Sequence, residues 1–331
     1  MELLKWLSES AGASGDENKI SDFIAGEVTR YCDKVFKDNM GNLYCFKQGT
    51  AENAKTIMLA AHTDEVGLII SSVTDDGFLK FRTVGGIDES VLLAKRVRIG
   101  ENKMLGVTGV KAVHLSTTEE REKKISCADM YIDIGATNKQ EALKLVKIGD
   151  YATFDTEFEK IGSLLKGKAF DDRLGCFILI NLLKKAHKNS VWYCFTVQEE
   201  LGLRGAAVVS RRIKADAAVA VECTTCLDLP GVDKDKTSTV VGLGPALTIV
   251  DGATYTNTLI RTKLKEAADK FQYKNLAAGG NDAGAIHLNN IKTAAVSIPA
   301  RYIHSPVCVV DEADVEECIK MLDKFLDTEE F

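Results

Sequence analysis

Five side chains with metal-binding atoms follow short apolar runs of the kind found in buried strands. These are His62, Asp171, Glu200, Glu222 and His304. The run 57–61 is too short for a core helix but suits a fully buried strand, and it leads directly into His62. Ligands of open α/β sheets bind in the crevice beyond the carboxyl ends of the strands. We therefore expect these side chains to converge on one cleft, although they are far apart in the sequence.

A set of imidazole and carboxylate groups of this kind suits two divalent cations. In two-metal sites the ions lie about 3.5–4 Å apart, share a carboxylate and take further ligands on either side. Asp64 follows His62 by two residues, so in an extended segment its carboxylate lies on the same face and can accept the second imidazole N–H. Glu199 and Glu200 are adjacent, so one can bind metal while the other moves protons.

Each of these residue types also has an ordinary structural role. Asp171 and Asp172 precede a strongly apolar helical stretch at 174–186, so either could cap that helix. Only one of the two can be the shared ligand. Taken alone, Glu222 would suit an ion pair, and the pair Glu199–Glu200 would suit a solvated surface. The functional interpretation depends on their joint occurrence after predicted strands.

The elements that must position these residues follow the order α/β, β, α/β. Helical patterns occur near residues 2–7 and 18–31, and Ser14-Gly15-Asp16-Glu17 suits the start of the second helix. From 67 to 159 short alternating runs are separated by glycine turns. We therefore predict a discontinuous α/β domain at 1–66 and 160–331, interrupted by a β-rich domain at 67–159.

Composition excludes several other classes of protein. The net charge of −6 comes without a long basic run, which argues against nucleic-acid binding. The sequence has no stretch of about 18 apolar residues, so it predicts no membrane span.

The nine cysteines are odd in number and scattered, unlike a secreted disulfide framework. Cys223 and Cys226 have CxxC spacing, but the sequence has no second CxxC pair to complete a structural zinc site. We therefore interpret both cysteines as structural. We also expect structural roles for His114, His187 and His287. A cytoplasmic location is the simplest expectation.

Five motifs together resemble one enzyme family along nearly the whole chain. They are Ala61-His62-Thr63-Asp64-Glu65-Val66-Gly67, Gly167-Lys168-Ala169-Phe170-Asp171-Asp172-Arg173, Val197-Gln198-Glu199-Glu200-Leu201-Gly202-Leu203-Arg204-Gly205-Ala206, Gly279-Gly280-Asn281-Asp282-Ala283 and Ile298-Pro299-Ala300-Arg301-Tyr302-Ile303-His304-Ser305-Pro306. The chain is similar to the tetrahedral, or glutamyl and deblocking, aminopeptidases. These are dinuclear metallopeptidases, also described as cellulase M or endoglucanase.

The resemblance implies a role for each candidate residue. His62 and Glu222 would complete one metal site, Glu200 and His304 the other, and Asp171 would bridge the ions. We favour Asp171 over Asp172 because related enzymes place the bridging aspartate four residues before a glycine, here Gly175. Glu199 would be the general base and Asp64 the residue behind His62.

The resemblance also implies a fold, a cofactor and an assembly. The fold would be a mixed-sheet α/β catalytic domain with an inserted, barrel-like dimerisation domain. The cofactor would be two divalent ions per subunit, with Zn²⁺ or Co²⁺ preferred and Mn²⁺ possible. Dimers would assemble into a tetrahedral dodecamer. Two departures concern substrate choice more than mechanism: Glu222 replaces the usual aspartate, and Asn281 stands where threonine is common.

The expected reaction is removal of N-terminal residues from short peptides, by attack of a water that bridges the two ions. An N-deacylase or carboxypeptidase could use the same two-metal chemistry, and the free-amine requirement of the substrate would separate them. A glycosidase would use paired carboxylates but gives no function to His62 and His304. A metal-stabilised binding protein would hold metal and hydrolyse no peptide.

Overall fold

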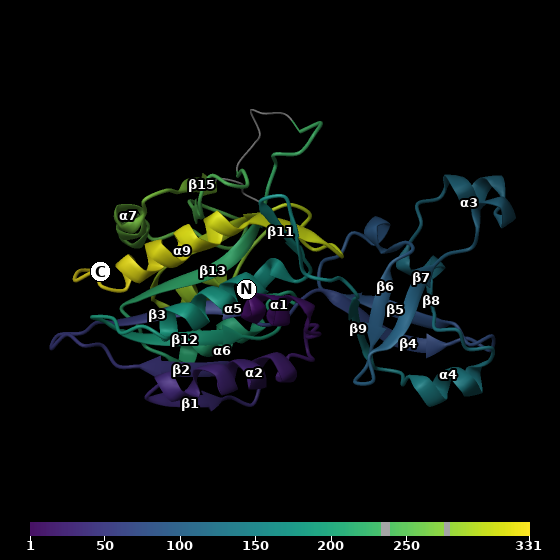
Figure 1. Cartoon of the computed structure of the whole chain (residues 1–331), viewed down its shortest axis with the longest axis horizontal. Coiled ribbons are helices and arrows are strands. Elements are labelled where there is room, and N and C mark those ends of the chain that lie inside the picture. Colours follow the sequence, from purple (N-terminus) through teal and green to yellow (C-terminus); the bar gives the residue numbers. More distant parts are fainter. Residues whose placement is uncertain (233–238, 275–278) are drawn as a thin grey trace.

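The chain forms an α/β body with a β-barrel projecting from one side, and both chain termini lie in the α/β body (Figure 1). The computed structural model describes residues 1–232, 239–274 and 279–331. The α/β body contains the candidate site residues, because all of them lie outside the barrel strands, which run from Gly67 to Phe154.

The α/β body is built on an eight-stranded mixed sheet with the order β1-β2-β12-β3-β13-β16-β14-β15. Its strands are β1 Lys34–Lys37, β2 Leu43–Lys47, β3 Thr56–His62, β12 Ser190–Thr196, β13 Ala217–Thr225, β14 Ala246–Thr248, β15 Gln272–Lys274 and β16 Lys292–Ala300. The four central strands β12, β3, β13 and β16 are parallel, so their carboxyl ends lie at one edge of the sheet.

Helices cover both faces of this sheet, which explains the continuous apolar runs of the central strands. One face packs against α1 Glu2–Glu9, α2 Asn18–Val28, α5 Phe170–Leu183, α7 Thr258–Ala267 and α9 Glu312–Phe325, and the other against α6 Arg204–Arg212 and α8 Ala283–Ile286. In β3, Ile57 and Leu59 join the first core while Met58 and Ala60 join the second, as expected for side chains that alternate along a strand.

The barrel is closed by six antiparallel strands in the order β4-β5-β8-β7-β6-β9. Its elements are β4 Gly67–Val73, β5 Leu79–Val84, β6 Arg96–Ile99, β7 Met104–Gly109, α3 Thr118–Glu122, β8 Tyr131–Asp133, α4 Lys139–Leu145 and β9 Tyr151–Phe154. It has an apolar core of its own, which includes Leu68, Phe81 and Ile132.

A small antiparallel sheet, β10-β11-β17, contains β10 Glu159–Ile161, β11 Leu164–Gly167 and β17 Cys308–Asp311. Single 3-10 turns are η1 Thr29–Tyr31, η2 Glu89–Leu92, η3 Val113–Leu115, η4 Cys127–Asp129 and η6 His287–Asn289. Within the described residues, none of the helices has the length and apolar character needed to cross a membrane. The predicted fold class, a mixed α/β body with an inserted barrel-like module, is confirmed.

Two local expectations need correction. Glu222 lies within β13 rather than beyond its end, because that strand continues to Thr225. Asp171 follows β11 of the small sheet and lies in the kinked start of α5. The helix α2 begins directly after the segment 14–17, as the sequence indicated, with Glu17 at the N-cap position; no side chain caps it, and the Ser14 hydroxyl donates to Asp64.

Candidate metal centre

The carboxylate of Asp171 lies between two histidines from opposite ends of the chain. Its Oδ1 is 3.5 Å from Nε2 of His62, at the end of β3, and its Oδ2 is 3.2 Å from Nε2 of His304, in the loop between β16 and β17. Each oxygen therefore faces a different imidazole, which is the arrangement that a carboxylate shared by two cations requires.

Glu200 and Glu222 lie beside these two histidines. Oε1 of Glu200 is 3.4 Å from Nε2 of His304, and Oε2 of Glu222 is 3.5 Å from Nε2 of His62. The structure thus brings the five sequence-predicted ligand residues into one cluster. All of them are buried or nearly so except His304, whose side chain is 39% exposed and opens the cluster to solvent.

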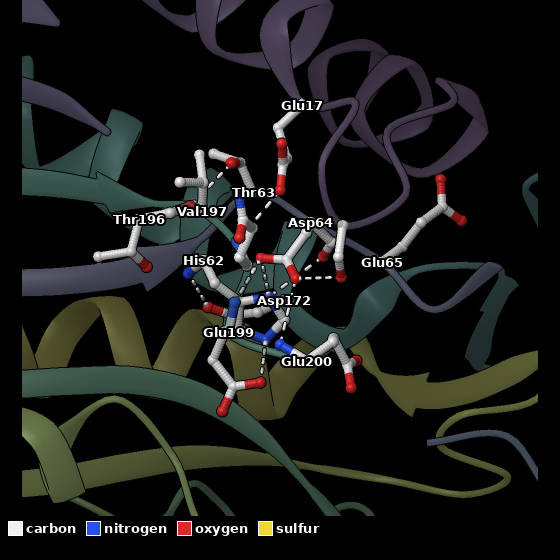
Figure 2. A network of polar contacts seen from close by, with 12 residues as sticks. Glu17, His62, Thr63, Asp64, Glu65, Asp172, Thr196, Val197, Glu199 and Glu200 are labelled. Atoms are coloured by element: carbon white, nitrogen blue, oxygen red, sulfur yellow. Dashed lines mark hydrogen bonds and ion pairs between the residues drawn. The ribbon is translucent and has the colours of Figure 1, made fainter. Parts of the chain in front are cut away.

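Glu199 and Asp64 adjoin the cluster in different ways. Oε2 of Glu199 is 3.9 Å from Nε2 of His62, so its carboxylate faces the space between the candidate ligands. The carboxylate of Asp64 is fully buried and accepts the backbone N–H groups of Glu199 and Glu200 at 3.0 and 3.1 Å (Figure 2). Asp64 is also behind His62 as expected, but the acceptor nearest to Nδ1 is its backbone carbonyl at 3.1 Å, with the carboxylate at 3.4 Å.

Asp172 has a different environment from Asp171. Its Oδ2 accepts the backbone N–H of His62 at 3.1 Å, and its Oδ1 accepts that of Gly175 at 2.9 Å. Both oxygens therefore hold backbone amides at the start of α5 and the end of β3. A second possible ligand group nevertheless joins Asp172 to His62 and Glu222, with ligand atoms within 4.8 Å of one another.

The electrostatics of the cluster favour added positive charge. Burial raises the pKa of Glu199 and Glu222 well above the ordinary value and that of Glu200 to about 7, and neighbouring carboxylates act in the same direction. Burial lowers the pKa of His304, but a hydrogen bond to Asp171 and the charge of Glu200 outweigh it and raise that pKa to about 9. Divalent cations would relieve this crowding of negative charge.

One buried oxygen also fits a cation. Among the described residues Oε1 of Glu200 has no hydrogen-bond partner, although Nε2 of His304 lies 3.4 Å away. The Glu200 oxygen and the His304 nitrogen face each other without a hydrogen bond, so the buried oxygen is an unsatisfied acceptor. Such an acceptor is costly in a protein interior unless it binds an ion. The residues present therefore fit divalent metal ions.

Charged residues beneath the cluster fix the loop that follows β3. Nζ of Lys168 lies 2.7 Å from Oε1 of Glu65, and Arg173 donates to the backbone carbonyl of Thr63 at 2.9 Å. Lys168, Glu65 and Arg173 are almost completely buried. The motif residues around His62 and Asp171 are thus joined by ion pairs and hydrogen bonds behind the site.

Sequence reasoning assigned no role in the site to two residues near the cluster. Asp282 is fully buried, and its backbone N–H donates to Oε1 of Glu222 at 3.2 Å. The Cys223 sulfur lies near the carboxylates of Asp171 and Asp172, with ligand atoms within 4.8 Å. The motif 279–283 was the only sequence signal for Asp282, and for Cys223 the signals were its position after Glu222 and its CxxC spacing with Cys226, which was interpreted as structural.

Comparisons with known proteins give one consistent family for the whole chain. The sequence profile described as M42 glutamyl aminopeptidase matches residues 41–321. A putative aminopeptidase of Acetivibrio thermocellus is 37% identical over 97% of this chain and 96% of its own. The TET aminopeptidase from the marine sediment archaeon Thaumarchaeota archaeon SCGC AB-539-E09 superposes with a TM-score of 0.95 at 34% identity, covering 100% of this chain and 96% of that one. The Pyrococcus horikoshii TET1 peptidase, which can assemble into a tetrahedron or a large octahedral shell, gives a TM-score of 0.89 at 33% identity, with 99% of each chain covered.

Proposed function

The chain belongs to the M42 glutamyl aminopeptidase family and is a metal-dependent aminopeptidase, and we propose that five clustered side chains hold its metal ions. These are His62, Asp171, Glu200, Glu222 and His304. The observation that carries this assignment is the position of the Asp171 carboxylate, with one oxygen toward His62 and the other toward His304. In the proposed arrangement Asp171 is shared, His62 and Glu222 complete one site, and Glu200 and His304 complete the other.

Imidazole and carboxylate ligands accept Zn²⁺, Co²⁺ and Mn²⁺, and we propose two ions per subunit, Zn²⁺ or Co²⁺ in preference to Mn²⁺. Bound divalent ions would supply Lewis-acid activation of a water and of the scissile carbonyl. The protein residues then have to bind the peptide, orient the ligands and move a proton.

Glu199 is the group that we assign to proton transfer. Its carboxylate is 3.9 Å from Nε2 of His62, and burial raises its pKa well above the ordinary value. A carboxylate with a raised pKa accepts a proton from the attacking water more readily at neutral pH and can return it to the leaving amine nitrogen. Asp64 supports this role by holding the backbone of Glu199 and Glu200.

Cleavage at the N-terminus follows from the charge of the site. The free α-amino group of a peptide is a cation at neutral pH, and it would bind close to a metal ion, beside an acidic side chain that is not itself a metal ligand. A blocked N-terminus offers no such cation. We therefore propose that short peptides with a free amine are the substrates.

Initial rates on aminoacyl-p-nitroanilides test the proposed function. The panel spans acidic, basic and apolar residues, and each substrate is paired with its N-acetylated form. Rates are measured before EDTA, after EDTA, and after restoring Zn²⁺, Co²⁺ or Mn²⁺. Chelator-sensitive cleavage of the free-amine substrates alone supports the proposal and identifies the preferred side chain and metal. Release of acetate from the acetylated substrates without release of p-nitroaniline would indicate the deacylase alternative, and no cleavage by metal-loaded protein would contradict the aminopeptidase mechanism.

We further propose that the protein is cytoplasmic and that its barrel mediates dimerisation, with dimers assembling into a tetrahedral dodecamer. The nine cysteines are all free thiols, as expected in a reducing compartment. Several large apolar side chains are exposed on the barrel region, namely Leu105, Val107, Val113, Leu115, Leu143, Leu145 and Ile148. Leu105 and Val107 lie two residues apart on β7, so they share one face of the strand.

Light scattering coupled to size-exclusion chromatography tests the assembly. The double substitution of Leu105→Asp and Val107→Asp should shift the wild-type particle to a smaller one, because charge on both residues opposes burial between subunits. A variant with the wild-type mass would exclude this face of β7 from the interface. Leu288→Asp, an exposed leucine on the α/β body, provides the control.

A further inference from the structure

Four successive backbone amides before and within the Glu199–Glu200 pair are held by side chains from the N-terminal part of the chain. Asn42 accepts the N–H of Val197 at 3.1 Å, and Glu17 accepts that of Gln198 at 3.1 Å. Asp64 accepts the next two, from Glu199 and Glu200. No part of the sheet holds this segment, because β12 ends at Thr196.

We infer that Glu17 is a positioning residue for the reaction, which fixes the turn carrying Glu199 and Glu200 through the backbone amide of Gln198. This inference rests on the proposed roles of Glu199 and Glu200. Figure 2 shows Glu17 and Asp64 approaching this segment from the same side of the site. Glu17 itself touches none of the proposed metal ligands through a hydrogen bond or ion pair among the described residues.

The turn needs such support because its backbone is strained. Gln198 has φ of 54° and Leu203 has φ of 58°, both in the left-handed region that non-glycine residues rarely adopt. A strained conformation persists only where surrounding contacts determine it. The amide of Gln198 is one of the four that side chains from outside the turn hold, and Glu17 binds it.

Glu17 is well placed to act as a fixed acceptor. It stands at the start of α2, where its carbonyl accepts the backbone N–H groups of Ile20 and Ser21 at 2.9 and 3.1 Å, so its main chain is anchored to the helix. Its Oε1 also accepts the N–H of Gly15 at 2.7 Å. The same oxygen therefore joins the Gly15 turn to the Gln198 turn, which lies 181 residues after Glu17 in the chain.

Keeping a carboxylate at this position is costly for stability. Glu17 is 5% exposed, and no Lys, Arg or His within residues 1–232, 239–274 and 279–331 forms an ion pair with it. Burial raises its pKa to about 7, only partly offset by the two amide hydrogen bonds. A buried acid that lowers stability yet holds the turn next to the proposed base is better explained by function than by folding alone.

The test compares Glu17→Ala with Glu17→Gln. Alanine leaves the Gln198 amide without its acceptor, whereas glutamine keeps an amide oxygen at the same reach. A buried carboxylate with the same kind of contacts provides a matched control: Asp314 accepts the backbone N–H groups of Gly242 and Gly244, both at 2.7 Å, and neither glycine belongs to the turn after β12. All variants are assayed at a temperature where thermal melts show them folded.

Kinetics provide the first measurement. E17A should lose roughly 10- to 100-fold in kcat with KM and metal content close to wild type, because a displaced base slows the chemical step. E17Q should recover most of this loss, and D314A should keep the wild-type kcat. A folded E17A with wild-type kcat, or an equal loss in D314A, would overturn the inference.

Amide hydrogen exchange on metal-free protein gives a second measurement that does not need activity. The peptide spanning 197–205 should exchange faster in E17A than in wild type, and at the wild-type rate in D314A. Unchanged exchange in E17A would overturn the positioning role. If wild type cleaves no aminoacyl substrate, the proposed function fails, and exchange alone then decides whether Glu17 fixes this turn.

Discussion

The Oδ2 atom of Asp171 lies 3.2 Å from Nε2 of His304, a residue 133 positions further along the chain. The neighbouring Asp172 has no such contact, because its two oxygens accept the backbone N–H groups of His62 and Gly175. The two adjacent aspartates therefore have separable tasks, one toward the proposed ions and one toward the backbone that positions them.

Replacing each aspartate by asparagine separates these tasks. Asp171→Asn should reduce the metal content and lower kcat by more than about 100-fold, because it removes the anionic ligand that the two proposed sites would share. Asp172→Asn should retain most of the metal but lose about 1–3 kcal/mol of stability, since its side-chain NH₂ must face one of two backbone N–H groups. Elemental analysis and chemical denaturation provide the readouts. Loss of metal in D172N alone would reverse the assignment.

Replacement of Glu199 by glutamine tests proton transfer. The substitution keeps the size of the side chain, and the backbone contact with Asp64 is unaffected. We expect kcat to fall by roughly 10²–10⁴-fold while metal content stays at the wild-type value, because an amide cannot accept the proton of the attacking water. Turnover close to wild type would remove Glu199 from the role of base.

Much of the fold could be predicted because the central strands are buried on both faces. The run 57–61 is apolar at every position, and it forms β3 between two helical layers. The predicted helix ends were less accurate. The helix predicted near 18–31 is α-helical only as far as Val28 and continues as a 3-10 turn. Packing determines such ends, and packing is absent from a local pattern.

The candidate site could be predicted in part for the same reason. Ligand-type side chains at the ends of buried segments are visible in the sequence, and the structure brings them together. The contact between Glu17 and Gln198 spans 181 residues and uses a backbone amide, which has no signature in the sequence. The hydrogen bond that the Ser14 hydroxyl donates to the Asp64 carboxylate at 2.6 Å likewise joins residues far apart in the chain and has no signature in the sequence.

Glu222→Asp tests the departure from the usual family residue. The glutamate reaches the site with Oε1 on the Asp282 amide at 3.2 Å and Oε2 3.5 Å from His62. Aspartate withdraws the carboxylate by about 1.5 Å. We expect the metal ion bound with His62 to be held at least about 10-fold more weakly, because the contact with Asp282 is lost as well.

Competition with a chromophoric chelator measures this affinity for Zn²⁺, Co²⁺ and Mn²⁺ in turn. Glu159→Asp, which shortens an exposed glutamate paired with Lys166, should leave all three affinities unchanged. Equal or tighter binding in E222D would mean that the extra methylene of Glu222 has no function in metal binding.

The raised pKa of Glu17 predicts a specific pH dependence of stability. The folded-state pKa of about 7 lies above the ordinary value of 4.5, so folding favours the protonated acid. This contribution is fully present below about pH 4.5 and is lost as pH rises through about 7. Glu17→Gln cannot ionise. It should therefore become more stable than wild type above pH 7, by up to about 3 kcal/mol for a shift of this size.

Urea denaturation of metal-free protein at intervals from pH 5 to pH 8.5 measures the difference. The free energies of unfolding of wild type and E17Q should diverge as the pH increases, whereas Glu2→Gln, an exposed glutamate on α1, should follow wild type throughout. Parallel curves for wild type and E17Q would show that Glu17 ionises without cost in the folded protein. A gain in stability at pH 8 that leaves kcat nearly intact would mean that the turn requires the acceptor oxygen of residue 17 and not its charge.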